Sequence, residues 1–90
     1  MEMAQAIAGP FAARSLADMG AEVIKVEQPG MGDMSRRIGP HFLGGESAYY
    51  LNFNRNKQSV TIDLRQEQGQ EVFRRLVKVS DVVFDAFRPS

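Results

Sequence analysis

The sequence predicts an α/β fold, built as an open, mostly parallel sheet with helices packed on it. Short apolar segments typical of strands alternate with amphipathic helical segments, in the order β-α-β-loop-α-β-α-β. A parallel sheet needs cover on both faces, yet the first strand is short and the last has no helix after it. We therefore expect residues 1–90 to be the N-terminal segment of a larger domain.

The first third of the chain carries the clearest local signals. Residues 1–7 are compatible with the tail of a strand, and Ala8-Gly9-Pro10 predicts a tight turn into a helix. Gly20 predicts the end of this helix. The apolar spacing predicts that the buried helix face carries Phe11, Ser15, Leu16 and Met19.

Glu22 to Val26 predict the next strand, in which Lys25 either reaches outward or sits at the strand end. Because short turns join the helix to both strands, we expect the two strands to pair in parallel. Gly and Pro recur from Gln28 to Gly45, which predicts a long irregular loop. Long loops in compact domains are often functional.

The second half predicts two strands and two helices. Residues 47–53 fit either a helix capped near Ser47 or an aromatic strand, and we favour the short helix. Residues 54–57 predict a turn, residues 66–78 an amphipathic helix and residues 81–85 a last strand. The strand between turn and helix is marked by the alternating apolar residues Val60, Ile62 and Leu64.

Composition excludes several kinds of function. The 11 basic residues balance the 11 acidic ones, so no broad field favours nucleic acid or a membrane surface. With no Cys and the single His41, neither a disulfide framework nor a metal centre of Cys or His ligands is expected. The apolar runs are too short to span a bilayer and no secretory leader is recognisable, so we expect a cytoplasmic protein.

Three features suggest ligand binding without fixing the chemistry. The turn at Ala8-Gly9-Pro10 opens a helix whose N-terminus suits an anion, although a tight turn by itself also needs small residues. Glu27 ends a strand where dinucleotide-binding folds place a ribose-binding acid, or else pairs with Lys25 or Arg36. Arg36-Arg37 suits phosphate contacts, or else is solvated. No catalytic constellation can be assembled from these residues.

Three separated segments together resemble a known family. They read AGPFAARSLADMGAEVIKVEQPGMGD, GGESAYYLNFNRNKQSVTIDL and DVVFDAFRPS. In order and spacing they are similar to the N-terminal part of the class III coenzyme A-transferases, the CaiB/BaiF family, which includes formyl-CoA transferase and α-methylacyl-CoA racemase. The resemblance covers nearly the whole chain.

The resemblance implies a Rossmann-like large domain that binds CoA, with residues 1–90 as its N-terminal segment, a smaller second domain, and a homodimer of two interlaced subunits. It also implies transfer of CoA from an acyl-CoA to a carboxylic acid through anhydride and thioester intermediates on an active-site Asp. No Asp of this chain matches that residue, so we expect residues 1–90 alone to be inactive. Acyl-CoA and the acid acceptor are the expected partners, without a metal.

Eight positions match CoA-contacting segments of the family. The segment near the thiol end corresponds to Ile7 and Ala8. The segment lining the adenosine and its phosphates corresponds to Ile62, Asp63, Leu64 and Arg65. The contact after the strand predicted at residues 81–85 corresponds to Phe87 and Arg88. All three segments follow strands, which places them where parallel sheets bind ligands.

Departures from the family pattern leave alternatives open. Formyl-CoA transferases carry Gln in place of Ile7, and Gln28 replaces a frequent basic residue near the adenine. The same fold would also serve a racemase that exchanges a proton α to the thioester. A small non-enzymatic binding or assembly module is the third alternative.

Overall fold

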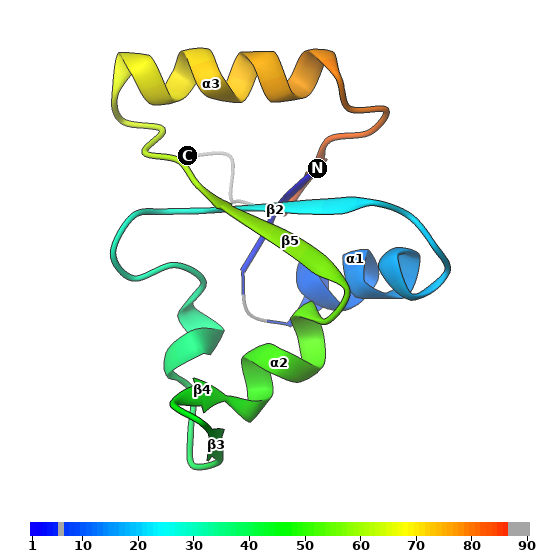
Figure 1. Cartoon of the computed structure of the whole chain (residues 1–90), viewed down its shortest axis with the longest axis vertical. Coiled ribbons are helices and arrows are strands. Elements are labelled where there is room, and N and C mark those ends of the chain that lie inside the picture. Colours follow the sequence, from blue (N-terminus) through cyan, green and yellow to red (C-terminus); the bar gives the residue numbers. More distant parts are fainter. Residues whose placement is uncertain (6, 87–90) are drawn as a thin grey trace.

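The computed structural model describes residues 1–5 and 7–86, and a four-stranded parallel sheet forms its centre (Figure 1). The strands lie in the order β5-β2-β1-β6, and every neighbouring pair runs parallel. The longest ladder joins β2 to β5 along their whole length, from Val23 opposite Lys57 to Glu27 opposite Thr61. The predicted α/β class and parallel pairing are confirmed. The strand bounds are β1 Glu2–Met3, β2 Val23–Glu27, β5 Lys57–Thr61 and β6 Phe84–Asp85.

Helices lie on both sides of this sheet. Figure 1 shows α1 and α2 on one side and α3 on the other. A short 3-10 helix, η1, and a small antiparallel hairpin of β3 and β4 connect β2 to α2. The bounds are α1 Ala8–Asp18, η1 Met34–Arg37, β3 Phe42–Leu43, β4 Glu46–Ser47, α2 Ala48–Asn54 and α3 Glu67–Lys78.

Both ends of α1 have a clear physical cause. The predicted turn at residues 8–10 is wrong, because these residues already form the first helical turn. Gly9 is buried there, and a Cβ on it would lie 2.4 Å from the Cβ of Ala4, so the helix packs directly on the end of β1. Gly20 ends the helix as predicted, with a φ of 104°, while Ala21 N–H donates to the Leu16 carbonyl over 3.1 Å.

The predicted buried face of α1 is wrong. Phe11 and Leu16 are about half exposed and Met19 is 77% exposed, whereas Ala13 and Ala17 pack on Val23 in the core. Small side chains four residues apart let the helix axis approach the sheet closely, which the larger apolar residues prevent. The apolar stripe therefore faces outward on the described surface.

Strand positions differ from the predictions by a few residues. The strand predicted at 22–26 spans 23–27, and its Lys25 is buried instead of reaching out. The strand predicted from Val60 to Leu64 ends at Thr61, although Ile62 N–H still donates to the Glu27 carbonyl over 3.0 Å. Only residues 84–85 of the predicted last strand pair with β1.

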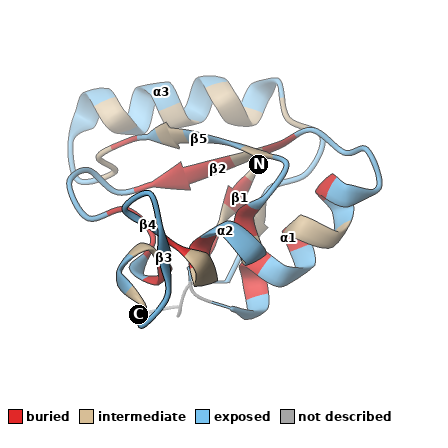
Figure 2. Ribbon diagram, turned by 60° about the horizontal axis from the view of Figure 1, so that its bottom comes forward, coloured by how far each residue is buried: buried red, intermediate tan, exposed pale blue. Residues whose placement is uncertain are grey.

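The remaining elements follow the sequence pattern more closely. The short helix preferred at residues 47–53 is confirmed as α2, and the Ser47 side chain caps it by accepting from Tyr50 N–H. The region 28–45, predicted to be irregular, also contains η1 and β3. Helix α3 is confirmed within one residue, although none of its residues is buried (Figure 2).

Candidate functional site

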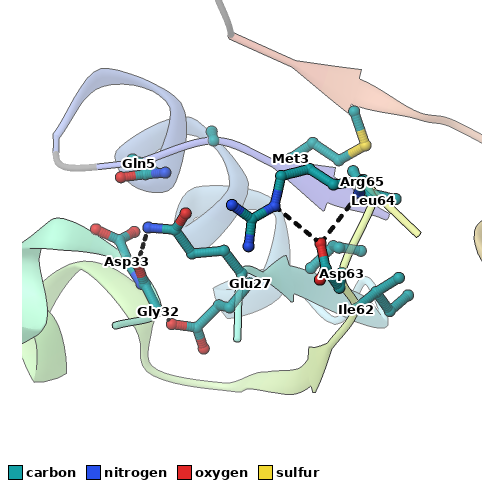
Figure 3. A pocket seen from close by; sticks show the side chains of 12 residues that line it. Met3, Gln5, Glu27, Gly32, Asp33, Ile62, Asp63, Leu64 and Arg65 are labelled. Carbon is teal, nitrogen blue, oxygen red and sulfur yellow. Dashed lines mark hydrogen bonds and ion pairs between the residues drawn. The ribbon is translucent and has the colours of Figure 1, made fainter. Parts of the chain in front are cut away.

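A pocket of about 230 Å³ opens where β1, β2 and β5 end at their carboxyl side. Figure 3 shows side chains that line it, which come from the ends of these strands and from the segments that follow them. Since three parallel strands end together there, their following loops converge on one cavity, as in other α/β proteins. The lining residues are Met3, Ala4, Gln5, Val26, Glu27, Gln28, Gly32, Asp33, Ile62, Asp63, Leu64 and Arg65.

The structure brings together half of the residues predicted to contact the ligand. Ile62, Asp63, Leu64 and Arg65 all line the pocket. Ile7 and Ala8 lie at the start of α1, both exposed, and do not line it. The remaining two, Phe87 and Arg88, lie outside the described residues.

The pocket also contains residues that the sequence analysis did not select as ligand contacts, above all Gln5, Gly32 and Asp33. Gln5 closely follows β1, and Asp33 follows β2 after a short loop. Their position after parallel strands was the available signal, because this rule applies to every strand of the sheet. Their convergence depends on how far each loop folds back, which local sequence does not specify.

The carboxylate of Glu27, one of the residues that line the pocket, is a hub of hydrogen bonds. Its Oε1 accepts from Asp33 N–H over 2.8 Å and from Arg36 Nε over 2.7 Å, while Oε2 accepts from Arg36 over 2.8 Å, from Tyr50 over 3.2 Å and from the Ser59 hydroxyl. The predicted pairing with Arg36 is thus confirmed, and the one with Lys25 is wrong. A carboxylate with this many donors holds β2, η1, α2 and β5 together.

Electrostatics keep this hub ionised. Burial alone would raise the pKa of the Glu27 carboxyl, but hydrogen bonds from Arg36, Ser59 and Asp33 outweigh it and lower the pKa to about 2. Burial and the neighbouring Glu27 charge raise the pKa of the Tyr50 hydroxyl, which therefore stays neutral. The Arg36 guanidinium also stacks on the Tyr50 ring at 3.9 Å from its centroid.

Four further charges are buried between the sheet and α1. Lys25 Nζ lies 2.9 Å from Glu2 Oε2 and 2.7 Å from Asp33 Oδ2, and donates to the Ala4 carbonyl over 3.0 Å. Lys57 Nζ lies 2.6 Å from the other Glu2 oxygen. Burial lowers the pKa of the Lys57 ammonium, against the opposing effect of its bond to Glu2. Two acids and two lysines leave this cluster, Glu2–Lys25–Asp33–Lys57, without net charge.

One cation of the pocket is open to solvent. The Arg65 side chain is 86% exposed and its Nε lies 3.2 Å from Asp63 Oδ1 (Figure 3). Hydrogen bonds from Arg65 lower the pKa of the Asp63 carboxyl, which favours its charged form. An exposed pair of this kind is held weakly, which leaves the guanidinium available to an anionic ligand.

His41, Tyr49 and Phe53 make contacts outside the pocket. His41 is exposed, and its carbonyl accepts from Ala48 N–H over 2.9 Å. Tyr49 and Phe53 pack together with ring centroids 5.0 Å apart. Within residues 1–5 and 7–86, no group of acidic or His side chains is arranged to hold a metal ion. No helix of that same part is long and apolar enough to cross a membrane.

Comparison with known proteins decides the family. The family model described as CoA-transferase family III matches residues 1–90. The chain belongs to CoA-transferase family III. Among its relatives, the Homo sapiens succinyl-CoA:glutarate CoA-transferase is 45% identical over 99% of this chain and 20% of its own length. The Chloroflexus aurantiacus succinyl-CoA–D-citramalate CoA-transferase is 48% identical, over 99% of this chain and 22% of its own.

Solved structures show the same relationship for this family III chain. The orthorhombic crystal form of Rv3272 from Mycobacterium tuberculosis superimposes with a TM-score of 0.86 at 44% identity. That match covers 100% of this chain and 26% of the other. The chain thus spans about a fifth to a quarter of the length of the relatives it matches.

Proposed function

We propose that residues 1–90 form a Rossmann-like segment that binds the CoA moiety of an acyl-CoA, within an enzyme that transfers CoA to a carboxylic acid. The observation that carries this proposal is the pocket at the carboxyl ends of β1, β2 and β5, whose third wall is Ile62 to Arg65. The strand order supports it, because the doubly wound nucleotide-binding sheet also begins with its third, second, first and fourth strands side by side.

The chemistry of the pocket suits the adenosine phosphate end of CoA. Apolar groups from Met3, Val26 and Ile62 offer a surface for a flat base, and the amides of Gln5 and Gln28 offer donors and acceptors. Arg65 supplies an exposed cation at the same cavity for a phosphate. A neutral chain thus binds an anionic ligand through one local charge.

The start of α1 suits the other end of CoA. Gly9 and Pro10 are buried against the end of β1, and no side chain caps the helix N-terminus at Ile7. Uncapped N–H groups there are available to a thioester oxygen or another partly negative atom. In the proposed arrangement, CoA runs from the pocket past Gln5 towards Ile7 and Ala8.

The proposed reaction needs an aspartate outside this chain. That carboxylate attacks the thioester, which releases the CoA thiolate and forms an anhydride. The thiolate then attacks the anhydride at the Asp carbonyl. The donor acid leaves, and CoA stays on the enzyme as a thioester of the Asp. The acceptor acid then reverses these steps. The two aspartates of the pocket are already engaged, Asp33 with Lys25 and Asp63 with Arg65, so neither is assigned this role.

Calorimetric titration of CoA into the protein tests the proposal, with Arg65→Gln as the diagnostic variant. Losing a charge-assisted hydrogen bond weakens binding by about tenfold or more. Arg74→Gln is the matched control, because Arg74 is also exposed and pairs with Glu71 over 3.3 Å, but lies on α3 away from the pocket. Absence of CoA binding at millimolar concentration, or equal effects of both substitutions, contradicts the proposal.

Transfer is favoured over racemisation because the relatives reported above are named CoA-transferases. CoA exchange between an acyl-CoA and an acid, without deuterium entering the α-carbon, is the expected result. The exposed apolar residues of α1 support the proposed homodimer over a free-standing module, since Phe11, Leu16 and Met19 form a face suited to further packing.

A further inference from the structure

Lys25 contacts two residues that line different walls of the pocket. Its ammonium donates to the carbonyl of Ala4, which lines the wall after β1, over 3.0 Å. The same atom lies 2.7 Å from the Asp33 carboxylate, which lines the wall after β2. The Lys25 side chain is 1% exposed and Asp33 is equally buried, so water does not compete for these contacts.

The Asp33 side chain links Lys25 to the start of η1, next to the loop that forms this wall. Its other oxygen, Oδ1, accepts from the Ser35 N–H and hydroxyl, each over 2.8 Å, and so begins η1. The neighbouring Gly32 has a φ of 65° and lies against the Glu27–Arg36 pair. The loop is therefore held at two of its three pocket residues, Gly32 and Asp33.

We infer that Lys25 is a positioning residue, which sets the separation of the β1 and β2 walls of the pocket and thereby its fit to the ligand. The geometry assigns it this role because β1 and β2 pair at Glu2 and Lys25. Ala4 and Asp33 lie beyond the ends of these two strands, and Lys25 contacts both of them. The identity of the ligand as CoA rests on the proposed function, whereas the positioning of the walls does not.

Lys57 provides a matched control within the same buried cluster. Both lysine side chains are at most 2% exposed and each pairs with one oxygen of Glu2. Lys57, however, donates to the Pro10 carbonyl over 3.1 Å and to Asn54 over 2.9 Å, and neither of these residues lines the pocket. Lys25→Met and Lys57→Met remove the same charge at similar burial but only the first removes the contact between walls.

The experiment measures hydrogen exchange and CoA affinity in the protein at its natural length. Lys25→Met is expected to speed amide exchange at residues 3–5 and 32–35 at least tenfold more than Lys57→Met, and to weaken CoA binding at least tenfold. If Lys25→Met does not fold, Lys25→Met/Asp33→Asn removes the contact while leaving the Glu2–Lys57 pair intact, and the same two results are expected.

The two readouts separate the two proposals. Equal exchange at both walls in the Lys25 and Lys57 variants overturns the positioning role, whatever happens to CoA. Faster exchange at the walls in a protein that never binds CoA supports the positioning role and contradicts the proposed ligand. Faster exchange with unchanged CoA affinity overturns the claim that wall separation sets the fit.

Discussion

Replacing Glu27 by Gln tests how much the buried carboxylate hub contributes to stability. The amide keeps the size of the side chain but loses its charge, and leaves Arg36 without its bidentate partner. Each pKa unit is worth about 1.4 kcal/mol, so a fall from 4.5 to about 2 corresponds to about 3 kcal/mol of native-state stabilisation at neutral pH. Removing one partner of a buried ion pair costs about the same, roughly 3–5 kcal/mol.

The pH dependence follows from the direction of this pKa change. A carboxyl whose folded pKa is depressed stabilises the protein fully above the unfolded pKa of 4.5, and loses that stabilisation as pH falls towards about 2. The difference in unfolding free energy between the protein and Glu27→Gln is therefore largest at pH 7. It shrinks to less than about half of that value at pH 3.

Urea denaturation followed by circular dichroism at pH 7 and pH 3 measures both quantities. Glu71→Gln is the matched control, since Glu71 pairs with Arg74 and Arg75 on the surface of α3 and its side chain is 53% exposed. That substitution is expected to cost roughly 0–1 kcal/mol. A loss no larger than the control, or one that is equal at both pH values, refutes the role assigned to Glu27.

Two further substitutions test the local reasoning. Gly69→Ala in α3 is expected to lower the urea midpoint, although Ala normally favours a helix by about 1 kcal/mol over Gly, because its Cβ would lie 1.9 Å from the Asp63 carbonyl oxygen; an increase like the one expected for the neighbouring Gln68→Ala contradicts this. Ser47→Ala removes the cap of α2 and the hydrogen bond to the Ile38 carbonyl, and is expected to cost about 1 kcal/mol in the same measurement. An unchanged midpoint means that the cap contributes nothing.

Elements defined by local signals were predictable from the sequence. Helix α3 shows a regular apolar spacing, α2 has a Ser cap, and α1 ends at a Gly with positive φ. The buried face of α1 was not predictable from apolarity. The helix lies so close to the sheet that only small side chains fit between them, so Ala13 and Ala17 are buried and Phe11 is not. Such a choice depends on the distance between helix and sheet, which is short because Gly9 of α1 lies directly against Ala4 after β1.

The candidate site was predictable in its position and not in its chemistry. Ile62 to Arg65 follow a parallel strand, and that rule together with the family resemblance was enough to select them. Lys25 was expected either to reach outward or to sit at the strand end, because its partners, Glu2 and Asp33, are distant in sequence or in a loop. Ion pairs between residues of such separate segments produce no periodic pattern in the sequence.

Buried charges, beside the apolar residues Val26 and Ile62, make up much of the interior around this pocket. The largest side chains buried below 2% exposure include Lys25, Glu2 and Asp33, whereas the buried apolar residues include small ones such as Ala4. Buried ion pairs add little net stability compared with apolar packing, but breaking one is costly and their geometry is specific. Such an interior is less stable than one packed with apolar side chains, but its ion pairs hold the residues at the carboxyl ends of the strands in defined positions. Substitutions in the charged cluster should therefore change ligand affinity according to the wall they contact, and not in proportion to the stability they remove.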